Sequence, residues 1–392
     1  MQETFDISAF LKAALAEDIG TGDVTGNAVI PADMQARFVM RAREEMVVAG
    51  LVFLPELFVM VEDWVKPLSE RSPHPEFAQK QIQTSPGGRG AQAALSVAIP
   101  NDEFLATKVG LGSPLPPGEV ENPFQDFRVR ASSGEGVVVI LHITDGMKVT
   151  AGTVLATLSG PARALLAGER VALNLVQHLS GIATQTRRYV DAVAGTNAKI
   201  YDTRKTLPGW RALQKYAVRC GGGHNHRMGL YDAVLIKDNH IAVAGGVKAA
   251  VAAARKYLAG AVTFTPPVTP ADAGAQLRES QRKMDPVIRR GDTEERGNTE
   301  EGRCLIQVEC DTLAQLDEAI AAGADMVLLD NMDVPTLAEG VARARAAGII
   351  SEASGNVNLD TVRAIAQTGV DRISIGRLTH SVMAVDIGMD EG

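Results

Sequence analysis

The sequence predicts an α/β fold, and two observations support this expectation. Hydrophobic residues make up 45% of the 392 residues but aromatic residues only 4%, which suits helices packed on buried strands better than an aromatic-rich β-sandwich. In the second half of the chain, short apolar runs alternate with stretches of helical spacing, a pattern typical of parallel βα units. The length indicates two domains or one enlarged domain.

The first 160 residues mix helix and strand signals. Residues 6–18 show the spacing of a short amphipathic helix, and residues 21–25 (TGDVT) are rich in capping groups that favour a turn. Four apolar runs have the composition of strands, and the last two suit an antiparallel pair: 35–43, 45–50, 137–143 and 153–158. Pro, Gly, Ser and Gln dominate from about 66 to 135, so we expect an irregular insertion there.

A long helix and six βα units are expected next. Apolar residues recur every three or four positions over 161–193, which predicts the helix. Six short strands are expected at about 198–202, 233–236, 305–309, 326–330, 349–353 and 372–375. Helical stretches lie between them, at 247–258, 312–322, 335–347 and 359–368. The alternation indicates either a barrel or an open doubly wound sheet.

A second insertion, at about 261–303, separates a helix from the next strand. It mixes acidic and basic residues without an apolar period, which is typical of a solvated segment. In a barrel of βα units, a helix-to-strand connection lies on the face opposite the carboxyl ends of the strands. We therefore expect a surface excursion far from the active site.

Charge and cysteine content restrict the partners and the compartment. The net charge of −8 argues against a nucleic-acid partner, so an anionic substrate requires a local basic cluster. The acidic N-terminus and the short, interrupted apolar stretch at 47–61 predict neither secretion nor membrane insertion. Cys220, Cys304 and Cys310 are odd in number and lack CxxC spacing, so we expect a reducing, cytoplasmic location.

Polar residues gather where the six predicted strands end. The residues concerned are Asp202, Arg204, Lys205, Lys237, Asp238, Asn239, His240, Glu309, Asp330, Asn331, Ser354, Gly355, Asn356 and Gly376. In α/β barrels the carboxyl ends of the strands form the rim that carries the active site. The sequence therefore predicts an active site at this rim.

One part of this rim is cationic. Arg204, Lys205, Arg227 and Lys237 are basic, and His226 lies beside them in the sequence. Cations are costly to gather unless an anion with several charges neutralises them. This half of the rim predicts a polyanionic substrate.

The other part offers carboxylates and small residues. Glu309 and Asp330 could hold Mg²⁺ together with a pyrophosphate, or accept hydrogen bonds from ribose hydroxyls. Residues 354–356 and 374–376 place small side chains and backbone N–H groups just ahead of helices, which suits a terminal phosphate. A polyanionic aromatic acid and a phosphorylated sugar would together satisfy both parts.

Simpler interpretations exist for each residue alone. Arg204 and Lys205 could be exposed loop charges, and Glu309 and Asp330 could cap helices or pair with an arginine. The three histidines at 224, 226 and 240 lack the spacing of metal ligands on a helix. The combination of all these residues at one rim favours the active-site interpretation.

Long stretches of the sequence resemble the quinolinate phosphoribosyltransferase family. The segment YDTRKTLPGWRALQKYAVRCGGGHNHRMGLYDAVLIKDNHI, at 201–241, is similar to the family hallmark. The resemblance extends through AEDIGTGDVT, SGPARALLAGERVALNLVQHLSGIAT, AAGADMVLLDNM, EASGNV and ISIGRLTHS. It covers nearly everything except the two insertions, which depart from the usual family length.

The resemblance implies a fold and a reaction. The fold is a six-stranded βα barrel domain over 161–379, with an N-terminal α/β sandwich domain over 1–160 that the tail 380–392 completes and that covers a partner's barrel. The reaction is the decarboxylating transfer of the phosphoribosyl group from phosphoribosyl pyrophosphate to quinolinate. Its products are nicotinate mononucleotide, pyrophosphate and CO₂, in NAD biosynthesis.

The resemblance also implies a role for each matching residue. The two carboxylates of quinolinate are bound by Arg170, Arg204, His226, Arg227 and Lys237. Arg170 is supplied by the neighbouring subunit, which implies an obligate homodimer; whether dimers assemble into a hexamer stays open.

The sugar donor is implied to occupy the remaining residues. Lys205, Glu309 and Asp330 form the phosphoribosyl pyrophosphate and Mg²⁺ group, and Ser354, Gly355 and Gly376 lie near the 5′-phosphate. The expected catalytic residues are Lys205, Lys237, Glu309 and Asp330, and either Lys237 or His226 assists the final protonation.

Two alternatives are compatible with a phosphosugar-binding barrel. A paralogue of the type associated with molybdenum transport would keep the barrel but use another acceptor, which the complete set of arginines disfavours. A non-catalytic barrel would bind a phosphosugar without turnover.

Overall fold

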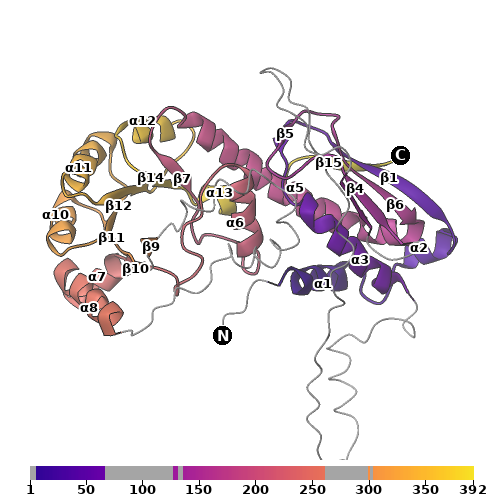
Figure 1. The fold of residues 1–392 in the computed structure, drawn as a ribbon, viewed down its shortest axis with the longest axis horizontal. Coiled ribbons are helices and arrows are strands. Elements are labelled where there is room, and N and C mark those ends of the chain that lie inside the picture. Colours follow the sequence, from indigo (N-terminus) through magenta and orange to yellow (C-terminus); the bar gives the residue numbers. More distant parts are fainter. Residues whose placement is uncertain (1–5, 67–126, 131–135, 261–298, 301–302) are drawn as a thin grey trace, which may run out of the picture.

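The computed structural model describes residues 6–66, 127–130, 136–260, 299–300 and 303–392. These residues form a sheet domain and a barrel domain, and the long helix α5 (Ala162–Ala192) runs from one to the other (Figure 1). Most of the expected insertions, at about 66–135 and 261–303, lies outside the described residues. Within the described residues, no helix is both long enough and apolar enough to cross a bilayer.

Three short helices open the sheet domain. Asp6 caps α1 (Ile7–Asp18) by accepting hydrogen bonds from two backbone N–H groups, and the helix buries Ile7, Leu11 and Leu15. The turn rich in capping groups expected at 21–25 is present over 21–23, and α2 (Val24–Val29) begins directly after Asp23, whose carboxylate accepts from the N–H of Gly26. A single 3-10 turn, η1 (Leu51–Phe53), leads into α3 (Leu54–Val65).

A five-stranded antiparallel sheet packs beside these helices. Its order is β15 (Ile387–Glu391), β1 (Gln35–Ala42), β6 (Val154–Pro161), β4 (Val138–Leu141) and β3 (Phe127–Arg130). β1 lies between β15 and β6, since Phe38 faces Leu158 on one side and Glu391 on the other. The strand expected at 45–50 is only β2 (Met46–Val47), which pairs with β5 (Lys148–Val149).

Two expectations of irregular structure were wrong in part. β3 falls inside the first insertion yet pairs with β4 over four residues. In the second insertion, β9 (Thr299–Glu300) pairs with β10 (Arg303–Cys304). Neither strand could be recognised from its neighbours in sequence, because each depends on a partner strand for its backbone hydrogen bonds.

The second domain is a parallel sheet of six strands, which confirms the predicted α/β class. The strands are β7 (Lys199–Tyr201), β8 (Val234–Ile236), β11 (Ile306–Cys310), β12 (Met326–Asp330), β13 (Ile350–Ser354) and β14 (Arg372–Ser374). The hydrogen-bonded order is β7-β14-β13-β12-β11-β8. Among the described strands, β7 and β8 are therefore the two edges, and His224 adds a parallel bridge to Tyr201 at the edge of β7.

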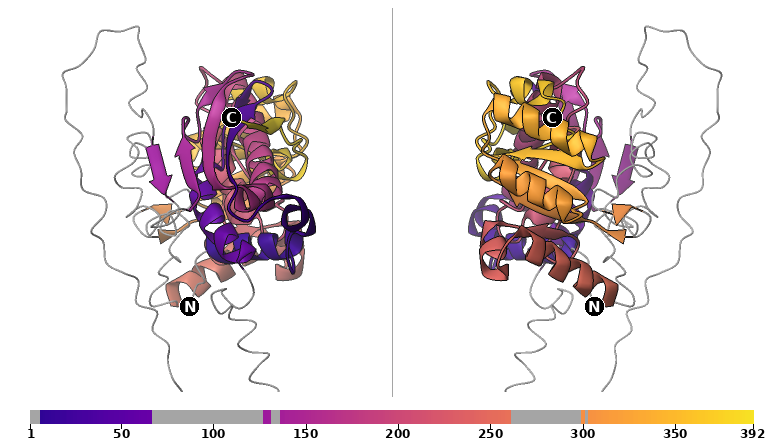
Figure 2. Two further views of the ribbon diagram at one scale, coloured as in Figure 1. Left: turned by 90° about the vertical axis from the view of Figure 1, so that its right-hand side faces the viewer. Right: turned by 90° about the vertical axis from the view of Figure 1, so that its left-hand side faces the viewer.

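Helices cover the outside of this curved sheet (Figure 1). Those along the outside are α8 (Val247–Gly260), α10 (Leu313–Ala321), α11 (Val334–Ala346) and α12 (Val362–Gln367), and the domain also contains α6 (Arg211–Cys220), α7 (Asp238–Ala244) and α13 (Arg377–His380). Their order along the chain alternates with the strands, as expected for βα units. The orange and yellow helices lie side by side in the right-hand view of Figure 2.

The helix α5 belongs to the cores of both domains. Near its start, Gly168 packs against Phe58 of α3, where an added Cβ would lie 3.0 Å from Val61. Near its middle, Gly181 lies against the backbone of Met383, so that the chain can pass towards β15. These two close approaches tie the sheet domain and the barrel to one rigid helix.

Candidate active site

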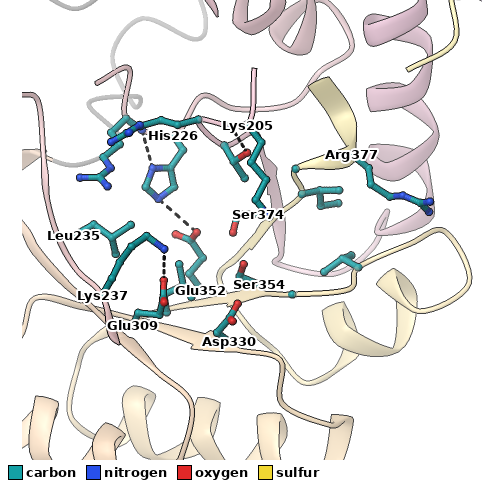
Figure 3. A pocket seen from close by; sticks show the side chains of 18 of the residues that line it. Lys205, His226, Leu235, Lys237, Glu309, Asp330, Glu352, Ser354, Ser374 and Arg377 are labelled. Atoms are coloured by element: carbon teal, nitrogen blue, oxygen red, sulfur yellow. Dashed lines mark hydrogen bonds and ion pairs between the residues drawn. The ribbon is translucent and has the colours of Figure 1, made fainter. Parts of the chain in front are cut away.

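A cavity of about 860 Å³ opens at the carboxyl ends of the six parallel strands. Ten of the predicted site residues line it: Arg204, Lys205, His226, Arg227, Lys237, Glu309, Asp330, Ser354, Gly355 and Gly376. Figure 3 shows these side chains converging from several strands and from the loops that follow them. The volume suits small-molecule ligands, since typical ligand pockets measure about 300–1,000 Å³.

Two arginines give one wall of the cavity an unbalanced positive charge. Arg227 is 8% exposed and donates from Nη1 to the carbonyl oxygen of Ala233 at 3.1 Å. Burial and the charge of Arg204 lower the pKa of Arg227 below its ordinary value. The Nε of Arg204 is buried without a hydrogen-bond partner among the described residues. A buried donor without an acceptor, next to a second guanidinium, favours an anionic ligand.

The loop that carries these groups is fixed by a buried ion pair. Lys215 is 1% exposed and its Nζ donates to the carboxylate of Asp202, which is fully buried, and to the carbonyl oxygen of His226 at 2.8 Å. Asn225 donates to the same carboxylate at 2.7 Å, and the backbone N–H of His226 does so at 2.8 Å. Three donors therefore converge on Asp202. Because its carboxylate is used in this way, Asp202 holds the loop beside the cavity in place and does not line the cavity itself.

Burial acts against the charges of this pair. It raises the pKa of Asp202 and lowers that of Lys215, while their mutual attraction opposes both shifts. All the groups that bind the carboxylate are donors, so the site is built for the ionised form of Asp202. The pair thus holds the backbone of His226 in place at the expense of two desolvated charges.

Hydrogen bonds determine where the ring proton of His226 lies. The backbone N–H of Arg227 donates to Nδ1 of His226 at 2.8 Å, so Nδ1 acts as an acceptor. A neutral imidazole that accepts at Nδ1 carries its proton on Nε2. That nitrogen lies 3.5 Å from Oε1 of Glu352, as Figure 3 shows.

Lys237 and Glu309 meet across the cavity mouth. The Nζ of Lys237 lies 2.5 Å from Oε2 of Glu309, and the side chains are 45% and 12% exposed. The backbone N–H of Lys237 donates to Nδ1 of His240, so His240 acts in hydrogen bonding at the start of α7. The ammonium group is therefore held by the ion pair and still accessible to a ligand.

Lys205 crosses directly over Gly376. A Cβ at position 376 would lie 2.7 Å from Cδ of Lys205, so only glycine leaves room for that side chain. The carbonyl oxygen of Lys205 accepts from Oγ1 of Thr379 at 2.7 Å. Gln214 fixes the rest of the loop by accepting from the N–H of Leu207.

The segment 354–356 follows β13 as a tight turn. Gly355 has φ of +90°, and Asn331 and Asn356 also adopt positive φ. The side chain of Asn356 donates to Oδ1 of Asn331 at 3.1 Å, and Asn331 donates to Asp330 at 2.6 Å. The turn therefore connects the predicted phosphate site to one of the predicted metal ligands.

Arg170 lies away from this cavity in its own chain. It is exposed on α5 and is absent from the cavity lining. Its placement is compatible with the expected contribution from a neighbouring subunit.

Several lining residues escaped the sequence interpretation, above all Glu352, Arg377 and His380. Glu352 is fully buried within β13, where a carboxylate among apolar neighbours was itself a signal. Arg377 and His380 follow Gly376 on α13 and are exposed at the edge of the cavity. Their position directly after the sixth strand could have identified them.

Known protein families match both parts of the chain. The description "Quinolinate phosphoribosyl transferase, C-terminal domain" matches residues 182–266 and 291–390, and the N-terminal domain of the same family matches 119–180. A probable nicotinate-nucleotide pyrophosphorylase [carboxylating] of Bacillus subtilis is 44% identical over 256 residues, covering 65% of this chain and 74% of the relative. The chloroplastic nicotinate-nucleotide pyrophosphorylase [carboxylating] of Arabidopsis thaliana is 32% identical over 98% of this chain and 83% of its own.

Solved structures agree with this assignment. NadC from Streptococcus pyogenes has a TM-score of 0.66 and 28% identity, and the alignment covers 100% of this chain and 97% of that chain. The nicotinate-nucleotide pyrophosphorylase from Francisella tularensis has a TM-score of 0.63, 28% identity and full coverage of both chains. On the matched domains and the full-length relatives together, the chain belongs to the quinolinate phosphoribosyltransferase family.

Proposed function

We propose that this chain transfers the phosphoribosyl group of phosphoribosyl pyrophosphate to quinolinate, releasing pyrophosphate and CO₂ and giving nicotinate mononucleotide for NAD biosynthesis. Relatives named nicotinate-nucleotide pyrophosphorylase [carboxylating] and quinolinate phosphoribosyltransferase [decarboxylating] support the reaction. The observation that carries the proposal is the buried Nε of Arg204, which has no hydrogen-bond partner among the described residues and lies beside Arg227 in the same cavity as Glu309 and Asp330.

The acceptor site follows from the distribution of charge. Quinolinate carries two adjacent carboxylates, and the guanidinium groups of Arg204 and Arg227 can neutralise both through paired hydrogen bonds. The Nε2–H of His226 and the ammonium group of Lys237 add two further donors. An acid with one carboxylate would leave part of this charge unpaired, which disfavours it.

The first step joins the pyridine nitrogen to C1 of the ribose while the C1–O bond to pyrophosphate breaks. Positive charge develops at C1 and negative charge on the leaving group, so Lys205 is placed to stabilise the departing anion. The carboxylates of Glu309 and Asp330, on the neighbouring strands β11 and β12, are placed to hold the sugar. The chain needs no nucleophile of its own, because the ring nitrogen attacks directly.

Mg²⁺ fits this site only together with the substrate. Among the described residues, no group of three or more His, Cys, Asp or Glu side chains could hold a metal ion. Glu309 and Asp330 would hold the ion, since the third lining carboxylate, Glu352, is buried against Gln307 and His226, and Mg²⁺ is commonly held by one or two carboxylates plus substrate phosphates. When bound in this way, Mg²⁺ would neutralise the pyrophosphate charge.

The second step removes CO₂. The bond between C2 of the ring and its carboxylate breaks, and the electron pair stays on C2 beside the quaternary nitrogen. C2 then takes a proton. We favour Lys237 as its source, because its ammonium group carries a transferable proton, whereas Nδ1 of His226 already accepts a hydrogen bond. Solvent then restores the proton on Lys237.

A direct assay tests the proposed reaction. Purified protein is incubated with quinolinate, phosphoribosyl pyrophosphate and Mg²⁺, and the release of CO₂ and of pyrophosphate is measured. Equal amounts of both products support the proposal, and a reaction with EDTA tests the need for the metal. Turnover with nicotinate but not with quinolinate would contradict the acceptor, and binding without turnover would indicate a non-catalytic barrel.

The homodimer is part of the proposal, with Arg170 acting in the neighbouring subunit's cavity. Its exposure on α5 and its absence from its own cavity support this arrangement. Inactive Arg170→Ala and Arg204→Ala chains, unfolded and refolded together, should regain roughly a quarter of wild-type activity, since half the dimers then contain one intact site. No recovery in verified mixed dimers would show that Arg170 does not act across an interface.

A cytoplasmic location is also proposed. Its support is the presence of three free cysteines, at 220, 304 and 310, which persist as thiols in reducing compartments. Fractionation of cells that produce the protein would test it.

A further inference from the structure

A buried carboxylate that the proposed reaction does not use lies at the floor of the cavity. Glu352 is fully buried in the middle of β13, between β12 and β14. Its Oε2 accepts a hydrogen bond from Nε2 of Gln307 at 2.9 Å. Its Oε1 is buried and, within the described residues, has no partner that meets the limits of a hydrogen bond. Burying a carboxylate oxygen without a hydrogen-bond partner is unfavourable in free energy, so a functional reason for it is expected.

The group that this oxygen faces is the ring of His226. Nε2 lies 3.5 Å from Oε1 of Glu352, which is the outer limit of a hydrogen bond. Nδ1 on the other side of the ring is occupied by the N–H of Arg227. The ring therefore lies between a fixed donor and a fixed acceptor, which together allow only the tautomer with its proton on Nε2.

We propose that Glu352 is a positioning residue that fixes the ring proton of His226 on Nε2 and orients this Nε2–H at the cavity. The inference rests on the proposed function, and it assigns His226 the role of a hydrogen-bond donor to a substrate carboxylate. The long contact matters here, because an Nε2–H held at 3.5 Å can still be shared with a second acceptor. Glu352 would thus orient the Nε2–H of His226 and still leave it able to donate to a substrate.

The charges around the ring agree with this role. The guanidinium groups of Arg204 and Arg227 lie in the same cavity wall as the ring. Lys215 from α6 holds the carbonyl oxygen of His226, and Asp202 from the loop after β7 holds its N–H. The only described carboxylate paired with the ring itself is Glu352. A neutral donor adds no charge to a wall that already carries two guanidinium groups.

Two substitutions separate the parts of this proposal. Glu352→Leu keeps the approximate shape and removes the acceptor. Glu352→Gln keeps an oxygen that can face Nε2, provided that the amide of Gln307 turns to accept from the new side chain. The matched control is Glu339→Gln on α11, which removes a carboxylate that is 55% exposed and lies away from the cavity lining.

The first measurement needs no substrate. Long-range ¹H–¹⁵N correlation spectra of protein labelled at histidine report which nitrogen of His226 carries the proton, with assignment from a His226→Gln sample. We expect Nε2–H in the wild type, in the Glu352→Gln variant and in the control. The Glu352→Leu variant should show a mixture of tautomers. Thermal unfolding confirms that each variant is folded.

The second measurement uses turnover. Loss of a uniform binding contact raises KM and leaves kcat nearly unchanged, so Glu352→Leu should raise the KM for quinolinate by about tenfold or more. Glu352→Gln should stay within about threefold of the wild type. The KM for phosphoribosyl pyrophosphate should change little in either variant.

Distinct outcomes would overturn the proposal. It fails if Glu352→Leu keeps the Nε2–H tautomer and the wild-type KM, or if the wild type itself carries the proton on Nδ1. It also fails if Glu352→Gln loses as much affinity as Glu352→Leu while its tautomer is unchanged, since the charge would then matter and not the acceptor. Failure of the proposed reaction would appear separately, as a wild type with the expected tautomer and no turnover of quinolinate.

Discussion

Replacement of Lys215 by methionine should strongly destabilise the barrel, because it leaves the carboxylate of Asp202 buried without its cation. Lys215 is 1% exposed and Asp202 is fully buried, so solvent cannot replace the lost charge. Two donors remain, the backbone N–H of His226 at 2.8 Å and the side chain of Asn225 at 2.7 Å. Removing one partner of a buried pair costs about 3–5 kcal/mol, which is roughly 150-fold to several thousand-fold in the folding equilibrium.

The sign of the pH dependence gives a further check. In Lys215→Met, burial without a counter-charge should raise the folded-state pKa of Asp202 further above its unfolded value. A carboxyl group with a raised folded-state pKa is stabilised by protonation, so the variant should approach the wild type as the pH falls through that pKa. At neutral pH, where the carboxylate is ionised, the difference should be largest.

Urea titrations followed by circular dichroism at pH 7 and at pH 5 measure both effects. The double variant Lys215→Met/Asp202→Asn removes both charges and should be more stable than Lys215→Met alone. A loss below about 1 kcal/mol in Lys215→Met at pH 7 would refute the idea of a desolvated ion pair. So would a difference that grows on acidification.

Three other predictions concern the cavity itself. Gly355→Ala should lose at least about 2 kcal/mol of stability and raise the KM for phosphoribosyl pyrophosphate. The reason is that φ of Gly355 is +90° and an added Cβ would lie 2.8 Å from the backbone nitrogen of Asn331. A variant with the KM and melting temperature of the wild type would contradict this. For Glu352, burial raises the pKa, but the attraction of His226 and hydrogen bonds with His226, Gln307 and Ser374 outweigh it and lower the pKa to about 2 from the ordinary 4.5. The stabilisation should therefore be present above about pH 4.5 and be lost as the pH falls through about 2, so urea midpoints of wild type and Glu352→Gln should converge on acidification; a constant difference would show that the charge is irrelevant. Arg204→Ala should lower kcat/KM, because it removes about 2–5 kcal/mol of transition-state binding. Activity within about twofold of the wild type would show that Arg204 is not part of the site.

Periodicity predicted the six parallel strands because most of them are buried, and the family resemblance, not the periodicity, favoured a barrel over an open sheet. The strand expected at 326–330 coincides with β12 (Met326–Asp330), and the others agree to within one or two residues. Once the strands are parallel, the residues that follow them must meet at one rim, which is why ten predicted site residues line one cavity. The carboxyl-end rule needs no knowledge of side-chain contacts.

Long-range pairing and hydrogen-bond direction were beyond such reasoning. β3 (Phe127–Arg130) has no local pattern that sets it apart from its surroundings, and it acquires its structure from β4. The support of His226 by Asp202 and Lys215 joins a strand end to a helix, which no spacing rule reveals. Glu352 was missed because it was counted as one more residue of a buried strand. A carboxylate at such a position needs a partner, and that requirement could have drawn attention to it.

The pairing of β15 with β1 has a consequence for how the protein is made. Phe38 and Glu391 are neighbours in the sheet, yet the whole barrel lies between them in the chain. While a ribosome synthesises the intervening residues, one edge of β1 has no strand beside it, and an open strand edge invites association with other nascent chains. The barrel must therefore become compact before β15 can pair with β1 and complete the sheet. A substitution that slows barrel folding should lower the soluble yield even where it leaves the finished enzyme unaltered.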